Sequence, residues 1–299
     1  MFPPNLLLIS ERLFHQHGNR NFAKLFRNML QMSDVRHRMV MLPGQQQLRD
    51  VLPVQVAGGR FVLFQSGGIS ERRRFFSAQR QTSIAEEFLR IFPDADIVLS
   101  QLRLEGTQIS LNADTALVSD KVLWDNRNYK SLQIIEDLEQ LLERRVLIVP
   151  SLHSDDSGSL AGFMRIAPNG TVLIQDSPLL EKGFRRRLES QFRRQHLPTK
   201  LLPNPYPQLS KKHPSGYLGY LELGQSVYCP IFGNNEADVK AVETMALLYP
   251  DAGCVLLNPK PFGGYNGWVF LQTWSAEVDQ QATRAADEAY GKPASAALG

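Results

Sequence analysis

The sequence predicts an α/β protein built from five similar units, and three observations support this fold class. Segments with apolar residues spaced three and four apart, typical of amphipathic helices, alternate with short strand-like runs rich in Val, Ile, Leu or Phe. Two distant segments, 92–99 and 249–256, share the pattern Pro-Asp-Ala-x-x-Val-Leu at the same place in their units. Such repetition indicates a radial or stacked architecture. No glycine-rich turn follows the first predicted strand, which argues against a Rossmann fold.

The predicted elements follow one another in a regular order. Because their apolar residues recur with the helical period, helices are expected at 22–30, 84–92, 134–142, about 184–194 and 237–249. Because they are short and rich in branched or aromatic residues, strands are expected at 5–9, 38–42, 61–64, 96–99, 108–111, 115–118, 146–149, 163–166, 171–174, 200–202, 254–257 and 268–271. The turn Pro168-Asn169-Gly170 is a strong hairpin signal, and a further hairpin is expected at 217–228.

Composition and charge limit the class of protein. The chain has 299 residues, of which 43% are hydrophobic and 21% charged, as in an ordinary globular protein. No apolar run approaches the ~20 residues that a membrane span requires. The net charge of +3 is milder than a dedicated nucleic-acid binder usually shows. Two cysteines fit a reducing, intracellular compartment, either cytoplasm or organelle matrix, and exclude a disulfide-rich scaffold.

The end of the chain differs in composition from the rest. Residues 275–299 are rich in Ala, Gln and acidic residues, whereas 1–274 carry the five units. We therefore expect a single domain over 1–274, followed by a C-terminal extension with a short helix and a loose tail. The alternative is an arm that docks on a partner.

Four motifs follow one another in a specific order along the chain. They are Leu104-Glu105-Gly106, then Asp125-Asn126-Arg127-Asn128, then Gly216-Tyr217-Leu218-Gly219-Tyr220 with Val227 and Pro230, and finally Gly263-Gly264-Tyr265-Asn266. Together they resemble the agmatine deiminases and peptidyl-arginine deiminases, the guanidine-modifying or pentein enzymes. The resemblance covers about 60–274 and is less clear over 5–59. It implies a five-bladed, pseudo-fivefold α/β propeller of ββαβ-type units with the active site at its centre.

The resemblance also implies a reaction and the groups that it needs. In the family, a cysteine thiolate attacks the guanidinium carbon, a histidine handles protons and carboxylates hold the cationic nitrogens. The covalent intermediate is then hydrolysed. A thiolate near a cation is nucleophilic at neutral pH, which explains the choice of cysteine.

This sequence departs from the family at four of these five positions. Val269 stands at the position of the nucleophile, Ser159 at that of the histidine, and Ala161 and Gln65 at two acidic positions. Only Glu105 keeps its carboxylate. Valine offers no nucleophile, and serine cannot replace histidine as a base at neutral pH. We therefore expect a pseudoenzyme that does not deiminate agmatine or arginine and that uses no cofactor or metal.

A vestigial pocket would remain around Glu105, Asn266 and Trp268. In the family register, Trp268 and Tyr265 would occupy the mouth of the old pocket. They could fill it as core aromatics or stack on a ligand, and the first is slightly favoured.

Other candidate groups have plainer explanations. Cys229 and Cys254 could be relocated nucleophiles, but buried small-hydrophobe behaviour is favoured for both. Ser157 and Ser159 lie near Asp155, Asp156 and His153, which superficially suggests a hydrolase or a metal site. The spacing is not that of a nucleophile elbow, so a polar loop is the favoured interpretation.

A basic helix is the strongest charge feature. Phe184, Leu188 and Phe192 share one face, and arginines fill the others, namely Arg185, Arg186, Arg187, Arg193 and Arg194. The plain interpretation is an outer helix with a solvated face. The alternative is contact with an acidic protein, RNA or anionic lipid, to which 72–74 could add.

Three functions follow, in order of preference. The first is an accessory or structural subunit of a larger assembly, which has a protein partner. The second is a module that binds a small cationic ligand through Glu105. The third is an enzyme of altered chemistry on guanidino compounds.

Overall fold

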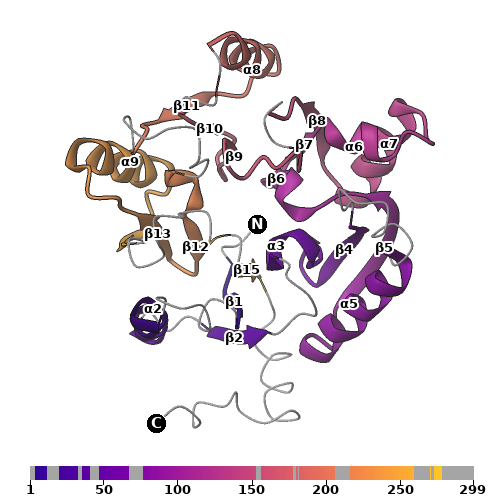
Figure 1. Cartoon of the computed structure of the whole chain (residues 1–299), viewed down its shortest axis with the longest axis horizontal. Helices are drawn as coiled ribbons and strands as arrows, with labels where there is room; N and C mark the ends of the chain where they lie inside the picture. Colours follow the sequence, from indigo (N-terminus) through magenta and orange to yellow (C-terminus); the bar gives the residue numbers. More distant parts are fainter. Residues whose placement is uncertain are drawn as a thin grey trace.

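Five three-stranded sheets surround a common centre in the computed structural model (Figure 1). The structure describes residues 4–11, 20–32, 36–40, 47–66, 77–152, 156–177, 180, 182–205, 216–258, 270 and 273–277. In every sheet the middle strand pairs antiparallel with one neighbour and parallel with the other. A parallel pair needs a crossover connection, and each crossover carries a helix. The repeating unit is therefore ββαβ.

The elements of the five units have the following bounds. The first unit holds β15 (Thr273–Ala276), β1 (Leu6–Ser10), α2 (Arg20–Met32) and β2 (Arg36–Val40). The second holds β3 (Val54–Ala57), β4 (Arg60–Gln65), α5 (Ser77–Ile91) and β5 (Asp96–Arg103), preceded by the short helix α3 (Leu48–Val51). The third holds the 3-10 turn η1 (Gly106–Gln108), β6 (Ile109–Leu111), β7 (Thr115–Ser119), α6 (Lys121–Asp125), α7 (Ser131–Leu142) and β8 (Arg145–Val149).

The last two units follow the same order. The fourth holds β9 (Met164–Ile166), β10 (Val172–Gln175), α8 (Lys182–Arg194) and β11 (Thr199–Leu202). The fifth holds the 3-10 turn η2 (Tyr217–Gly219), β12 (Leu221–Leu223), β13 (Ser226–Pro230), α9 (Asn235–Leu248) and β14 (Gly253–Leu257). The five helices expected from the sequence are all present at these places.

The ring is closed by strands from opposite ends of the chain. β15 pairs antiparallel with β1, with Leu6 opposite Ala276 and Leu8 opposite Trp274. The expected domain boundary after residue 274 is therefore misplaced, because it falls inside a strand that completes the first unit. The strand expected at 268–271 lies outside the described residues except for Phe270, as do 278–299.

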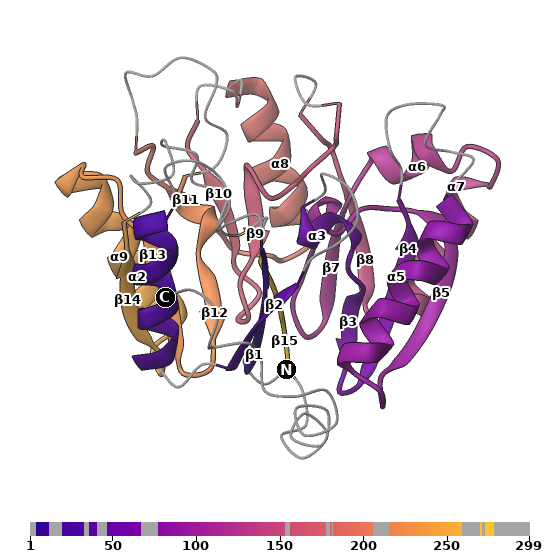
Figure 2. The ribbon, with the colours of Figure 1, turned by 60° about the horizontal axis from the view of Figure 1, so that its bottom comes forward.

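Neighbouring units share their apolar cores, and this sharing holds the ring together. Leu188 and Phe192 of α8 pack with Leu117 and Val149, which belong to the sheet of the preceding unit. The helices of the five crossovers lie on the outside of the ring, whereas the short helix α3 lies near its centre (Figures 1 and 2). Because burying a large apolar side chain contributes about 1.5–3 kcal/mol, each unit depends on its neighbours for much of its stability.

The sequence mislocated one hairpin and missed four short elements. Residues 217–219 form a 3-10 turn instead of the first arm of the hairpin expected at 217–228, and β12 begins only at Leu221. The elements missed were α3, β3, α6 and β15, each of four or five residues and too short to show a period. No helix in the described ranges is long and apolar enough to cross a membrane.

Candidate functional site

Backbone contacts bring the expected site positions together at the centre of the ring. The Leu104 amide donates to the Gln65 carbonyl at 3.0 Å, which places the end of β4 beside Glu105. The Leu160 amide donates to the Thr107 carbonyl at 2.8 Å, which places the segment of Ser159 and Ala161 beside η1. The second, third and fourth units therefore meet at the centre of the ring. Asn266, Trp268 and Val269 lie outside the described residues. Phe270, which follows Val269 in the sequence, lines a cavity beside these contacts.

Glycines permit this close approach. A Cβ on Gly106 would stand only 1.9 Å from the Arg49 carbonyl oxygen, so α3 could not lie against η1 with any larger residue there. Gly158 has φ +65°, and a Cβ there would come within 2.6 Å of the Lys121 side chain. Both positions require glycine on physical grounds, one for space and the other for backbone conformation as well.

The residues at the expected positions make ordinary polar contacts through side chains or backbone. The Gln65 amide donates to Gln101 Oε1 at 3.2 Å, at the exposed end of β4. The Ser159 backbone amide donates to Ser157 Oγ at 3.2 Å. Gln108 joins the two segments, because its Oε1 accepts from the Glu105 amide at 3.1 Å while its Nε2 donates to the Ser157 carbonyl at 2.6 Å.

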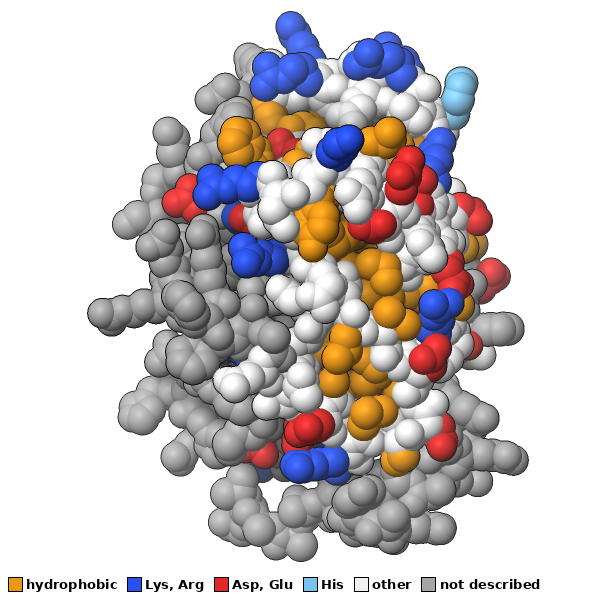
Figure 3. All heavy atoms as spheres, turned by 90° about the vertical axis from the view of Figure 1, so that its right-hand side faces the viewer, with side chains coloured by type: hydrophobic (Ala, Val, Ile, Leu, Met, Phe, Trp, Pro, Cys, Tyr) orange, Lys and Arg blue, Asp and Glu red, His pale blue; other side chains and the backbone are white. Residues whose placement is uncertain are grey.

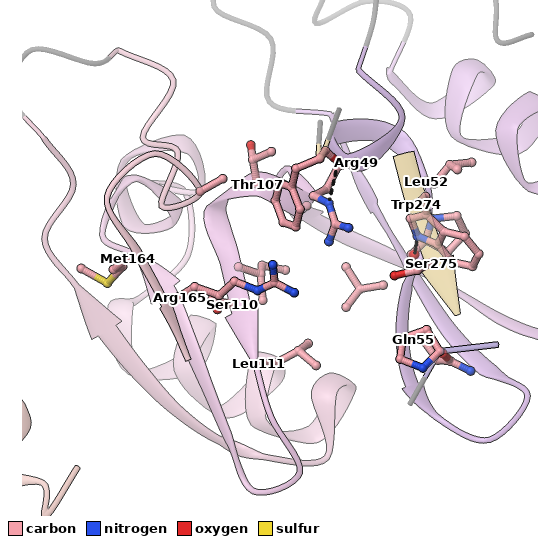
Figure 4. Close-up of a pocket in the computed structure, with 17 residues that line it drawn as sticks. Arg49, Leu52, Gln55, Thr107, Ser110, Leu111, Met164, Arg165, Trp274 and Ser275 are labelled. Carbon is pink, nitrogen blue, oxygen red and sulfur yellow. Dashed lines mark hydrogen bonds between the residues drawn. The ribbon is translucent and has the colours of Figure 1, made fainter. Parts of the chain in front are cut away.

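A cavity of about 160 Å³ lies next to these positions (Figure 4). Ala161 lines it, together with Thr107 and Phe270, which are near neighbours in sequence of Glu105 and Val269. Arg49 of α3 and Arg165 of β9 also line it, and Figure 4 shows both guanidinium groups directed toward the same space. We call it the central cavity.

Arg165 is held by partners from the fifth unit. Its Nη1 donates to the Tyr220 carbonyl and its Nη2 to Glu222 Oε1, both at 2.7 Å. The guanidinium also lies 3.9 Å from the centre of the Tyr220 ring, a cation–π contact. Burial raises the pKa of the Tyr220 and Tyr249 phenols, whose hydroxyls are 2.9 Å apart, so both remain neutral. Glu222 is therefore the anion that balances Arg165.

Arg49 has a different environment. Its Nε donates to the Phe270 carbonyl at 3.3 Å, and its guanidinium lies 3.7 Å from the centre of the Phe270 ring. Burial and the charge of Arg165 lower the pKa of Arg49 to about 9, while Glu222 and Asp50 oppose this effect. The sequence did not point to Arg49 or Glu222, since each lies in a short segment that carries no functional motif.

The two cysteines lie together on neighbouring strands. Cys229 Sγ and Cys254 Sγ are 3.1 Å apart. Burial and the adjacent Cys254 thiol raise the pKa of Cys229, which disfavours its nucleophilic thiolate form. Cys254 is exposed, so the expectation that both are buried is wrong for Cys254. The reason is that β14 is the outer strand of its sheet, paired on one side only.

The arginine-rich helix α8 has the face that the sequence predicts. Phe184, Leu188 and Phe192 are buried, while Arg186, Arg187, Arg193 and Arg194 are exposed. Arg185 differs from them, because it is half-buried and lies 3.5 Å from Asp176 and 3.6 Å from Glu189. Among the described residues, no three His, Cys, Asp or Glu side chains gather as a metal site would require; His153 and Asp155 lie outside them.

An apolar stripe runs along one outer face of the ring (Figure 3). That face carries α5 and β5 as well as α6 and α7, and the last two lie side by side in Figures 1 and 2. Trp124 on α6 is 76% exposed and Leu132 on α7 is 67% exposed. Exposed apolar side chains that form a continuous surface often mark an interaction site.

Five ββαβ units around a central site define the pentein fold of guanidine-modifying enzymes. The family described as Porphyromonas-type peptidyl-arginine deiminase matches residues 19–270, and the chain belongs to that family. A comparison with curated proteins finds no match.

Solved structures agree with this fold. The C. jejuni agmatine deiminase is 12% identical with a TM-score of 0.69, over 93% of this chain and 95% of that one. A Porphyromonas gingivalis protein described as a putative arginine deiminase is 16% identical with a TM-score of 0.70, over 92% and 96%. The Enterococcus faecalis agmatine deiminase is 14% identical with a TM-score of 0.67, over 93% and 94%. At these identities the likeness concerns the fold.

Proposed function

We propose that this chain is a non-catalytic pentein that serves as an accessory subunit of a larger assembly. The observation that carries the proposal is the charge of the central cavity. Ala161 lines its wall at a position where the family resemblance implies a carboxylate, and Arg49 and Arg165 lie beside it. A guanidinium substrate is a cation that needs carboxylates around it, and two arginines oppose its entry.

The groups of the reaction support the same proposal. Val269, Ser159 and Gln65 offer neither a thiolate, nor a base active at neutral pH, nor a carboxylate. Among the five family positions, Glu105 alone keeps a carboxylate that could contact a cation. One carboxylate can contribute to binding, but it does not supply a nucleophile.

An assay of turnover tests the absence of catalysis. The full chain is incubated with agmatine, arginine and an arginine-containing peptide, and ammonia and ureido products are measured beside an active agmatine deiminase. We expect no product above the protein-free blank. Turnover that disappears in Glu105→Gln would overturn the proposal, because it would place Glu105 in a working site.

Exposed apolar side chains on α6 and α7 support a protein partner. Trp124 and Leu132 expose large apolar side chains on adjacent helices, where a partner could bury them. Trp is among the residues that dominate binding energy at protein interfaces. The exposed arginines of α8 offer a second, charged contact.

The apparent mass of the tagged chain under native conditions, in an extract of the source cells, tests whether it has a partner. We expect the tagged chain to migrate well above 33.8 kDa, and the Trp124→Ser/Leu132→Ser variant to return toward the mass of the free chain. The matched control is Leu247→Ser, since Leu247 is 75% exposed on a different helix, α9. If all three forms migrate as free chain, the accessory role is wrong.

A further inference from the structure

The central cavity has the features of a binding site that is not tied to guanidine chemistry. Its lining comes from the first four units, including Arg49 of α3, Ser110 of β6, Arg165 of β9 and Ser275 of β15. Its volume of about 160 Å³ is far above the ~10–15 Å³ that one water molecule needs in the same measure. The cavity therefore has room for a small organic molecule.

The two arginines at the cavity differ in how far partners within the chain satisfy their charge and their N–H donors. Arg165 is paired with Glu222, as described above. Arg49 Nε donates to the Phe270 carbonyl, and the Arg49 guanidinium lies over the Phe270 ring. No other hydrogen bond of the Arg49 side chain is found among the described residues. Its two Nη groups, with four N–H donors, are directed toward the cavity (Figure 4). Its remaining donors therefore face the open space.

Arg144 shows how this protein satisfies a buried guanidinium elsewhere. Its Nε, Nη1 and Nη2 donate to the carbonyls of Asn112, Leu142 and Val56 at 2.6, 2.6 and 2.5 Å. Every nitrogen of Arg144 thus has an acceptor within the chain. Within the part of the chain that the structure describes, Arg49 has one such acceptor, the Phe270 carbonyl, and its half-buried guanidinium borders the cavity instead.

We propose that the central cavity binds a small organic carboxylate, with Arg49 as its principal partner and Arg165 as a second cation. A carboxylate matches the fork of guanidinium N–H groups with two parallel hydrogen bonds. The lowered pKa of Arg49 agrees with an unbalanced charge that an anion would relieve. The proposal goes beyond the accessory role, since it concerns a ligand rather than a partner.

The walls of the cavity favour an organic anion over a bare inorganic one. Leu52, Leu111, Met164 and Trp274 line it with apolar surface, which suits the body of a small acid. The Ser110 hydroxyl accepts from the Ile166 amide at 2.9 Å, so its own proton is available to donate to an anion. The ligand class is therefore a carboxylate head on a short apolar body.

Matched neutral and charged probes test the proposal on the full chain. Butyrate and benzoate are compared with butyramide and benzamide at constant ionic strength, by thermal shift and calorimetry, with inorganic phosphate and agmatine as further probes. We expect both carboxylates to raise the melting temperature saturably, because they bind the folded state, whereas the amides and agmatine should not. Equal shifts from the amides, or phosphate binding as strongly as benzoate, would overturn the proposed ligand class.

Single substitutions test whether the carboxylate binds in the central cavity. Arg49→Met should weaken benzoate binding at least tenfold, whereas Arg186→Met on the exposed face of α8 should leave it unchanged. Ala161→Glu, which adds a carboxylate to the cavity wall, should abolish the response even if Arg49→Met folds poorly. Wild-type affinity in either cavity variant would show that the carboxylate binds elsewhere.

Discussion

The arginines of α8 and those of the central cavity differ in how the sequence presents them and in what surrounds them. Arg185, Arg186 and Arg187 stand in a row, and the helix carries two more, so the sequence marks this helix as basic. Arg49 and Arg165 stand alone in segments 116 positions apart, and only the ring of five units brings them to one cavity. A run of charge marks a solvated face, whereas a charged site assembles from isolated residues.

The two groups of arginines also differ in their exposure to solvent. Charges on α8 are screened by water and salt, so each contributes little to stability. At the central cavity water is restricted, and both favourable and unfavourable interactions are larger. Substitutions should therefore have large effects at the centre and small effects on α8.

The largest effect is expected where the backbone holds Arg49 in place. In Gly106→Ala the new Cβ would lie 1.9 Å from the Arg49 carbonyl, so α3 or η1 must move. We expect a loss of at least about 2 kcal/mol in the free energy of unfolding, together with weaker carboxylate binding. Urea denaturation measures the first. Gly183→Ala is the control, because a Cβ there meets nothing within 4 Å; an equal loss in both would contradict this account.

Breaking the ion pair of Arg165 should have the next largest effect. Arg165→Met leaves Glu222 without its partner in a site where each side chain is about one-fifth exposed or less. We expect a cost of about 2–3 kcal/mol, somewhat below that of a fully buried pair. Adding Glu222→Gln removes the unpaired charge and should recover part of the loss in urea denaturation. A double variant no more stable than Arg165→Met would mean that packing, and not charge, dominates.

Repetition and turn chemistry made most of the fold predictable. The helices and the strand pairs of the middle units follow from periodic apolar residues and from Pro168-Asn169-Gly170, where Gly170 has φ +85°. The first unit was harder to predict, because β15 comes from the other end of the chain and only long-range pairing defines it.

The candidate site was predictable only in part. Motif order singled out Glu105, Ser159 and Ala161, and backbone contacts bring their segments together in the fold. Arg49 could not be found in this way, since α3 has four residues and no pattern links it to β9. Its importance depends on Gly106, which admits α3 to the centre, and that contact is visible only in three dimensions.

A smaller effect should appear in the pH dependence of Arg49. Its pKa of about 9 in the folded state lies well below the value in the unfolded chain, because burial and the charge of Arg165 lower it more than Glu222 and Asp50 raise it. Between these values the unfolded chain holds the proton and the folded chain has lost it, so stability rises with pH in this window. Relative to Arg49→Met, the wild type should gain about 1.4 kcal/mol from pH 8 to pH 10 in urea denaturation. A constant difference between the two proteins would show that Arg49 keeps an ordinary pKa, and saturating benzoate should suppress the gain.

The smallest effect is expected on α8, at its most engaged arginine. Arg185 lies 3.5 Å from Asp176 and 3.6 Å from Glu189, but about a third of its side chain is exposed. Such pairs contribute little in water, so Arg185→Ala should lower stability by no more than about 0.5 kcal/mol, and less in high salt. Arg186→Ala, at an exposed position of the same helix, is the control in the same urea titration. A loss at Arg185 as large as that at Arg165 would remove the contrast between the outer helix and the centre, because it would place a strongly desolvated charge on the surface of the ring.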